Sequence, residues 1–329
     1  MLRVEQLLAD KALLEDKAYG VLAGLAVGDS FGDASRKPDN QLAYGMTTDF
    51  NSVAAWSTDD TEFALLTATI LADSGGRFST ADVVRGWMEK VVVQEEFPRG
   101  GASEIEAARN LRRGLQPPQT GIYNAYAHSD GAAMRTAPIG IVCAGRPEKA
   151  AELAAVDACL SHARDGIWGA QAVAVAVSLS MVNAGMDEIF SAVCAIPPPD
   201  SWFAHALKRA GEIVNTAGGS VLDAWMPLHD ELWCSYKAAV PEAVAQAFGV
   251  LLLCPDDFRK GVTLAGNFGR DADTIGAITG AVLGARFGAE AIPSVWREKT
   301  RYPTGTCLSF AKGIDLEELA GRLAALAEQ

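Results

Sequence analysis

The distribution of apolar residues constrains the fold of this chain more than any other feature of its sequence. Apolar residues recur at helical spacing almost throughout, and no alternating pattern of the kind that forms a β-strand reaches a useful length. Two stretches, 16–32 (DKAYGVLAGLAVGDSFG) and 277–288 (AITGAVLGARFG), are rich in alanine and glycine, and the first is suited to close helix packing in a protein centre. The chain is therefore predicted to be all-α, with residues 1–329 forming a single domain.

Helix start and stop signals divide the rest of the chain into helices and two long loops. Residues 57–74 begin with capping residues and end before a Gly-Gly pair, whereas 241–254 carry Pro and Glu in their first turn. Further helices are expected at 80–93, 103–115, 257–267 and 315–329, and within the Ala-rich segment 146–218, which is broken at 196–202. The segments 33–52 and 115–131 are polar and aromatic and are predicted to be loops, where binding sites are often found.

Charge and cysteine usage exclude several classes of protein. The 28 basic and 41 acidic residues give a net charge of −13, so binding to bulk nucleic acid or to an anionic membrane surface is not expected. The six cysteines contain no CxxC pair and the four histidines no HxxxH or HExxH pattern, which disfavours a disulfide framework and a histidine-based metal site. Without a signal-peptide block or a membrane-spanning apolar run, we expect a soluble, cytoplasmic protein.

Two acidic clusters about 210 residues apart contain the candidate metal-ligating and catalytic residues. The first is WSTDDTE (56–62), with Thr58, Asp59 and Asp60, and the second is RDADT (270–274), with Asp271, Asp273 and Thr274. Each cluster lies directly before a predicted helix, so each carboxylate and hydroxyl also suits a helix cap. Capping needs only one oxygen, however, and clustered like charges are unfavourable unless a cation neutralises them.

If the two clusters meet in space, they offer four carboxylates and two hydroxyls. Such hard oxygen ligands are preferred by Mg²⁺, Mn²⁺ or Ca²⁺, and four negative charges balance two divalent ions. A centre of this kind binds and orients a water or a substrate hydroxyl.

Several motifs together resemble the ADP-ribosylglycohydrolase family, over about residues 17–296. The resemblance rests on GVLAGLAVGDSFGD, STDDTE, DGAAMRTAPIG, LSHARDG, PEAVAQAFGVLL, GRDADTIGAITGAVLGARFG and IPSVW, in this order. It implies a compact, orthogonal multi-helix fold and two Mg²⁺ or Mn²⁺ ions. It also implies hydrolysis of the glycosidic bond that joins ADP-ribose to an acceptor. The metal ligands that it implies are Thr58, Asp59, Asp60, Asp271, Asp273 and Thr274, with Asp59 or Asp60 as the general base.

The chain departs from the family pattern at three positions. Arg36 stands where members often carry a glutamate near the metals, and Asp33, three residues earlier, is a possible substitute for it. Arg270 replaces a glycine and suits either a phosphate contact or a structural ion pair. Asp130 replaces an asparagine and, with Asp33, is a candidate for the acid that protonates the leaving group.

Eight residues are predicted to contact substrate. Several of them have an alternative structural role. Arg135 could equally anchor a helix end by hydrogen bonds to carbonyl groups, and for His162 a structural hydrogen bond is favoured over catalysis. Gly131 and Gly269 suit tight backbone turns. The full set is Asp33, Asp130, Gly131, Met134, Arg135, His162, Gly269 and Arg270.

Three functions are compatible with these residues. The first is a metal-dependent glycosidase, a hydrolase of N- or O-glycosidic bonds, that acts on ADP-ribosylated protein or on a smaller ribosylated molecule. The second is a catalytically weak relative that binds ADP-ribose-like ligands, and the third is a metal-dependent phosphoester hydrolase. The first is favoured because both acidic clusters are complete.

Overall fold

A computed structural model describes residues 2–51 and 54–327, and within these ranges the regular structure is helical, which confirms the predicted all-α class. The α-helices are α1 (Val4–Ala9), α2 (Lys11–Ser35), α3 (Pro38–Tyr44), α4 (Asp59–Asp73), α5 (Thr80–Trp87), α6 (Ala102–Arg112), α7 (Gln119–Ile122), α8 (Ala137–Val142), α9 (Pro147–Ala158), α10 (Asp165–Met181), α11 (Met186–Cys194), α12 (Trp202–Thr216), α13 (Val221–Glu231), α14 (Val240–Leu253), α15 (Phe258–Gly266), α16 (Ala272–Phe287), α17 (Ser294–Thr300) and α18 (Leu316–Ala327). Short π- and 3₁₀-helical turns occupy Met88–Val92, Ala133–Arg135, Ala289–Ala291 and Ser309–Ala311.

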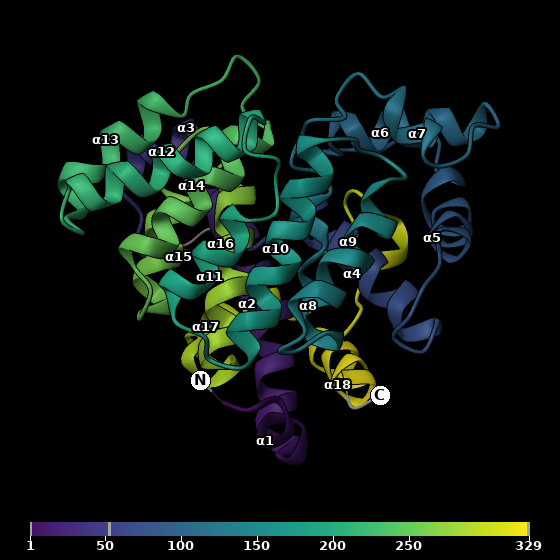
Figure 1. Cartoon of the computed structure of the whole chain (residues 1–329), viewed down its shortest axis with the longest axis horizontal. Helices are drawn as coiled ribbons and strands as arrows, with labels where there is room; N and C mark the ends of the chain where they lie inside the picture. The colour runs from purple at the N-terminus through teal and green to yellow at the C-terminus, as the bar shows by residue number, and fades with distance from the viewer. Residues whose placement is uncertain (1, 52–53, 328–329) are drawn as a thin grey trace.

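The helices are arranged around a central pair, α2 and α16. Helices α12 to α15 lie on one side of this pair and α4 to α7 on the other, with α10 packed across the middle (Figure 1). In the part of the chain that the structure describes, no helix is both long enough and apolar enough to cross a membrane.

Most of the expected helices occur close to their predicted positions. The segments 57–74, 241–254 and 257–267 contain α4, α14 and α15, whose ends match the capping and proline signals. The predicted loop 33–52 is wrong in part, because α2 continues to Ser35 and Pro38 begins α3, where a proline suits the first turn. The loop 115–131 likewise contains the short α7. Residues 52, 328 and 329 of the predicted segments lie outside the described residues.

Glycines spaced four residues apart bring α2 and α16 into backbone contact. Gly20, Gly24 and Gly28 of α2 face Gly284, Gly280 and Gly276 of α16, so the two helices run antiparallel. A Cβ atom on Gly24 would lie only 2.1 Å from the carbonyl oxygen of Gly280, and one on Gly28 only 1.9 Å from that of Gly276. Since residues four apart share one helix face, each helix presents a stripe that only glycine fits.

This antiparallel pairing also determines which polar groups meet at each end of the two helices. At one end, buried Lys17 donates to the carbonyl oxygens of Ala285 (2.8 Å) and Arg286 (2.7 Å), which are otherwise unpaired at the C-terminus of α16. At the other end, the last turns of α2 lie beside the N-terminus of α16. Asp29 and Asp33 therefore lie near Asp271 and Asp273.

We expect Gly24→Ala to destabilise the protein by about 3 kcal/mol, because the added methyl group forces the two central helices apart. The matched control is Gly321→Ala in α18, where a Cβ atom meets nothing within 4 Å and a gain of up to about 1 kcal/mol is expected. Urea unfolding measures the free energy of unfolding of both variants. Equal stabilities for the two variants would contradict the packing described here.

Candidate metal centre

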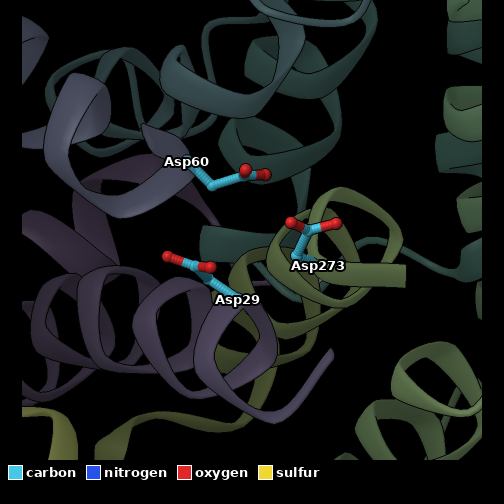
Figure 2. Close-up of side chains that lie close together, drawn as sticks. All are labelled: Asp29, Asp60 and Asp273. Carbon is cyan, nitrogen blue, oxygen red and sulfur yellow. The ribbon is translucent and has the colours of Figure 1, made fainter. Parts of the chain in front are cut away.

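Three buried aspartates from three different helices face one another at this end of the central pair. Asp29 of α2, Asp60 of α4 and Asp273 of α16 each place a carboxylate oxygen within 4.8 Å of the others, around a common space (Figure 2). Asp60 and Asp273 lie in the first turns of their helices, where the helix dipole favours negative charge. The two acidic clusters of the sequence therefore meet in space.

Asp29 joins the beginning of α4 to α2. Its carboxylate accepts hydrogen bonds from the backbone N–H of Thr58 (2.9 Å) and Thr61 (3.2 Å), and from the Thr58 hydroxyl (2.7 Å). Burial nevertheless raises the pKa of Asp29 to about 6. The sequence analysis missed this residue as part of the site, although a carboxylate that follows the uncharged Ala/Gly-rich run 18–28 was a usable signal.

Asp60 has a buried oxygen whose hydrogen-bonding capacity is unused. Its Oδ2 atom accepts from the Thr58 hydroxyl at 3.2 Å, but its Oδ1 atom has no hydrogen-bond partner among the described residues. Burial, and then the charges of Asp273 and Asp29, raise the pKa of Asp60 well above its ordinary value. Because an unpaired buried carboxylate is unfavourable, a bound cation fits this position.

Asp59 and Asp273 experience the same crowding of negative charge. Burial, and then the charge of Asp273, raise the pKa of Asp59 well above its ordinary range. For Asp273, burial and Asp271 together raise the pKa to about 7, even though Arg36 acts in the opposite direction. The cluster thus carries more negative charge than the cationic side chains beside it compensate.

The capping interpretation holds for the first cluster and fails for the second. The Thr58 hydroxyl accepts from the Asp60 N–H at 3.3 Å and caps α4. Asp271 occupies the corresponding position of α16 but makes no side-chain capping bond. Its Oδ1 atom instead contacts the Lys237 ammonium group at 2.6 Å, and the Asp273 Oδ1 atom contacts the Arg36 guanidinium group at 2.5 Å.

The carboxylates open into a cleft of about 230 Å³. Of the residues predicted from the sequence, those that line the cleft are Asp59, Asp60, Asp130, Gly131, Met134, Asp271, Asp273 and Thr274. Thr58 lies beneath the cleft with its hydroxyl bonded to Asp29.

Five of the predicted substrate contacts, Asp33, Arg135, His162, Gly269 and Arg270, do not line this cleft. Asp33 pairs with Arg99 and with Lys37 (3.0 Å). Arg270 pairs with buried Glu242 (2.5 Å) and packs over the Trp233 ring. Of its two alternatives, the geometry therefore favours the structural ion pair over the phosphate contact.

Arg135 and His162 belong to a buried hydrogen-bond network under the cleft. Arg135 pairs with Asp157 (2.7 Å) and Glu104 (3.1 Å) and donates to the Ser161 hydroxyl (2.8 Å). His162 is bonded through both ring nitrogens, to the hydroxyls of Ser161 (2.7 Å) and Ser129 (2.9 Å), and burial lowers its pKa well below the ordinary value. A neutral histidine with both nitrogens engaged fits a structural role.

Glu104 is a further cleft residue that the sequence analysis missed. Its buried carboxylate lines the cleft and accepts from the Ser103 hydroxyl at 2.6 Å. Gly131 makes room for it, since a Cβ atom there would lie 2.3 Å from Glu104 Oε1, so its role is close approach rather than a tight turn. Nothing in the local sequence distinguishes Glu104 from the other charged residues of α6.

The sequence itself places the chain in a known family. The family profile described as ADP-ribosylglycohydrolase matches residues 10–329, so the chain belongs to the ADP-ribosylglycohydrolase family, as the motifs predicted. An uncharacterized protein of Archaeoglobus fulgidus is 30% identical over 300 residues, which cover 87% of this chain and 92% of that protein.

Two further relatives have names that state an activity. The ADP-ribosylarginine hydrolase of Pseudomonas putida is 26% identical, over 87% of this chain and 75% of its own length. The ADP-ribosyl-[dinitrogen reductase] glycohydrolase of Rhodospirillum rubrum is 24% identical, over 87% of this chain and 90% of its own. A solved structure described as an ADP-ribosylglycohydrolase-related protein complex shares the fold, with a TM-score of 0.65 and 23% identity, over 95% of this chain and 99% of that one.

The raised pKa values predict how stability depends on pH when a chelator has removed divalent ions. A carboxyl group whose folded pKa exceeds its unfolded pKa stabilises the protein only while it stays protonated, so its contribution is lost as the pH rises through the folded value. For Asp273 this contribution to stability is lost between pH 3.8 and about pH 7. We expect the melting temperature to decrease over this window in calorimetry, and Asp273→Asn to flatten the decrease. A melting temperature that rises across the window would contradict this.

Proposed function

We propose that this protein is a divalent-metal-dependent glycohydrolase that cleaves the N- or O-glycosidic bond between an ADP-ribosyl group and its acceptor. The observation that carries this proposal is the buried, unpartnered Oδ1 atom of Asp60 among carboxylates from three helices, at the floor of a cleft. Family membership supports the glycosidic chemistry.

The donor set fits a hard divalent cation. The residues of the two clusters offer only carboxylate and hydroxyl oxygens, which Mg²⁺ and Mn²⁺ prefer, and Asp29 adds a further carboxylate. A bound divalent cation supplies positive charge that orients ribose hydroxyls and lowers the pKa of a water. The residues proposed to hold it are Thr58, Asp59, Asp60, Asp271, Asp273 and Thr274, of which Thr58 acts by fixing Asp29 and Asp60.

The structure supports different roles for the two adjacent aspartates of the first cluster. Asp60 is buried among the other carboxylates, so it serves as a ligand. Asp59 is partly exposed and lines the cleft, so a water can reach it. We assign Asp59 as the general base that takes a proton from the attacking water as the glycosidic bond breaks. The charge of a divalent cation held by the neighbouring aspartates would oppose the rise in the pKa of Asp59 and favour the ionised form that a base needs.

Of the two candidates for the acid, Asp130 suits the role better than Asp33. Burial, and then the charges of Asp271 and Asp60, raise the pKa of Asp130 well above its ordinary range, which favours its protonated form. For Asp33 the effect of burial is outweighed by Lys37 and Arg99, which leave its pKa below the ordinary value. A carboxyl group that stays protonated at neutral pH can donate its proton to a leaving group.

The names of the relatives suggest ADP-ribosylarginine, in a protein or peptide, as the first substrate to test. The cleft of about 230 Å³ is smaller than the ~300–1,000 Å³ typical of ligand sites, so it fits the ribosyl group at the scissile bond. A smaller ribosylated molecule is the second substrate class that this size accommodates.

The proposal predicts that the protein releases ADP-ribose from an ADP-ribosylarginine peptide with Mg²⁺ or Mn²⁺ present, and not with a chelator. Asp60→Asn is expected to lower kcat by more than about 100-fold, because it removes a ligand. The matched control is Asp200→Asn at an exposed position, which should leave kcat unchanged. Chromatography measures free ADP-ribose, and a phosphate assay on the same samples tests for a phosphoester hydrolase. Equal activity with and without chelator would contradict the proposal.

The assigned roles of Asp59 and Asp130 predict different responses to the leaving group. Asp59→Asn should lower kcat by about 10²-fold or more for every substrate, because it removes the base, while Asp29, Asp60 and Asp273 still bind Mn²⁺. Asp130→Asn should slow a poor leaving group by about 10²-fold and leave a nitrophenyl riboside almost unaffected. Steady-state kinetics on both substrates separates the two roles. An equal loss on both substrates in Asp130→Asn would rule out its assignment as the acid.

A further inference from the structure

A second cavity, of about 620 Å³, lies at the opposite end of the central helix pair from the metal centre. It is bounded by the beginning of α2, by the turn that follows α16, and by α17 and α18, at the end of the molecule where both termini lie (Figure 1). Its volume falls within the ~300–1,000 Å³ typical of small-molecule sites. None of the residues that line it also lines the cleft of the metal centre, so the two are separate sites.

The lining of this cavity is acidic. Its carboxylates come from all of the bounding segments and are Glu15, Asp16, Glu290, Glu298, Glu317 and Glu318. Two arginines also line it, but both are engaged within the protein. Arg297 donates to the carbonyl oxygen of Ala289 at 2.6 Å, and Arg301 pairs with Asp315 (2.7 Å) and Glu317 (2.8 Å). An anionic ligand is therefore disfavoured.

The negative charge of the lining exceeds the positive charge around it. Lys11 pairs with Glu15 at 3.6 Å, and the charge of Lys17 acts on Asp16. The two arginines together offset the two carboxylates that Arg301 contacts. The remaining three carboxylates form no ion pair within the described ranges and belong to Glu290, Glu298 and Glu318. Their uncompensated charge favours a cationic ligand.

A buried tyrosine hydroxyl faces the same cavity. Tyr19 lines the cavity and is only 8% exposed, and within the described ranges its hydroxyl forms no hydrogen bond. The charges of Glu317 and Arg301 reach this hydroxyl and influence its pKa, as expected for a group that points toward the cavity. Because buried hydroxyls in proteins are normally hydrogen-bonded, this group is available to a ligand.

The carboxylates of the cavity are spread around it and do not converge on one point. Among the described residues, the group of acidic side chains with oxygens close enough to hold a metal ion is that of Asp29, Asp60 and Asp273 at the metal centre. A divalent ion needs several oxygens at about 2.0–2.6 Å, so the dispersed carboxylates suit a ligand whose positive charges are dispersed as well. A linear polyamine, an aliphatic chain with several ammonium groups that each donate hydrogen bonds, has this form.

We propose that this cavity binds a linear polyamine. Its ammonium groups pair with Glu290, Glu298 and Glu318, and one of them donates to the Tyr19 hydroxyl. The proposal is independent of the proposed glycohydrolase activity, because the cavity and the cleft of the metal centre share no residue.

The test is calorimetric titration of spermidine into the unmodified protein, with Mg²⁺ present so that the carboxylates of the metal centre are not available to the polyamine. We expect saturable binding at one site, and much weaker binding of butylamine, which carries a single ammonium group. Tyr19→Phe should weaken spermidine binding by about fivefold, because it removes one hydrogen bond. A triple variant should weaken it by about tenfold or more, because it removes the unpaired charges by Glu290→Gln, Glu298→Gln and Glu318→Gln.

The matched control is a triple variant with the same change of net charge at exposed positions outside the cavity, Glu148→Gln, Glu152→Gln and Glu188→Gln. It should leave the affinity for spermidine unchanged. The glutamates of both triple variants are exposed, so both proteins are expected to fold, and circular dichroism checks this.

Equal weakening in the two triple variants would show that spermidine responds only to the net charge of the protein, and would overturn the proposal. Equal affinity of the unmodified protein and Tyr19→Phe would also overturn it, as would equal affinity for spermidine and butylamine. A protein that releases ADP-ribose but binds no spermidine would overturn this proposal and leave the glycohydrolase standing. Spermidine binding without hydrolysis of any ribosyl substrate would do the reverse.

Discussion

The backbone contact between α2 and α16 is the constraint on which the rest of the structure depends. Glycines at four-residue spacing let the two helices approach until a Cβ atom at Gly24 or Gly28 would overlap a carbonyl oxygen of the partner helix. Because this contact fixes the register of the pair, it also fixes which ends meet. Lys17 satisfies the C-terminus of α16 at one end, and Asp29 and Asp273 lie side by side at the other.

The site is built where three helix ends converge and leave negative charge uncompensated. Both carboxylate oxygens of Asp29 accept hydrogen bonds from Thr58 and Thr61. These bonds attach the beginning of α4 to α2 and so position Asp60 beside the central helix pair. Burial and mutual repulsion then raise the pKa values of Asp59, Asp60 and Asp273. Protein interiors tolerate such a group of carboxyls only when protons or cations neutralise it, which connects the fold to the proposed chemistry.

Local signals predicted the helices and both acidic clusters, because caps, proline positions and apolar spacing act over a few residues. The confirmed all-α class and the ends of α4 and α14 follow from such signals. Glu104 and Lys237 were missed because their roles arise only from contacts between distant segments. For Arg270, the choice between a phosphate contact and a structural ion pair likewise depended on a residue distant in the sequence, Glu242. Arg36 was noticed as a departure from the family pattern, but its position among the carboxylates required the structure.

The central claim is that the carboxylates at the ends of α2, α4 and α16 hold a divalent cation. Anomalous diffraction at the manganese absorption edge, from crystals grown with Mn²⁺, tests this claim most directly because it locates the ion without reference to activity. The account predicts an anomalous peak in contact with Asp60 and Asp273, within the cluster that Asp29 completes. A fully ordered cluster with no peak, or a peak elsewhere in the protein, would contradict it.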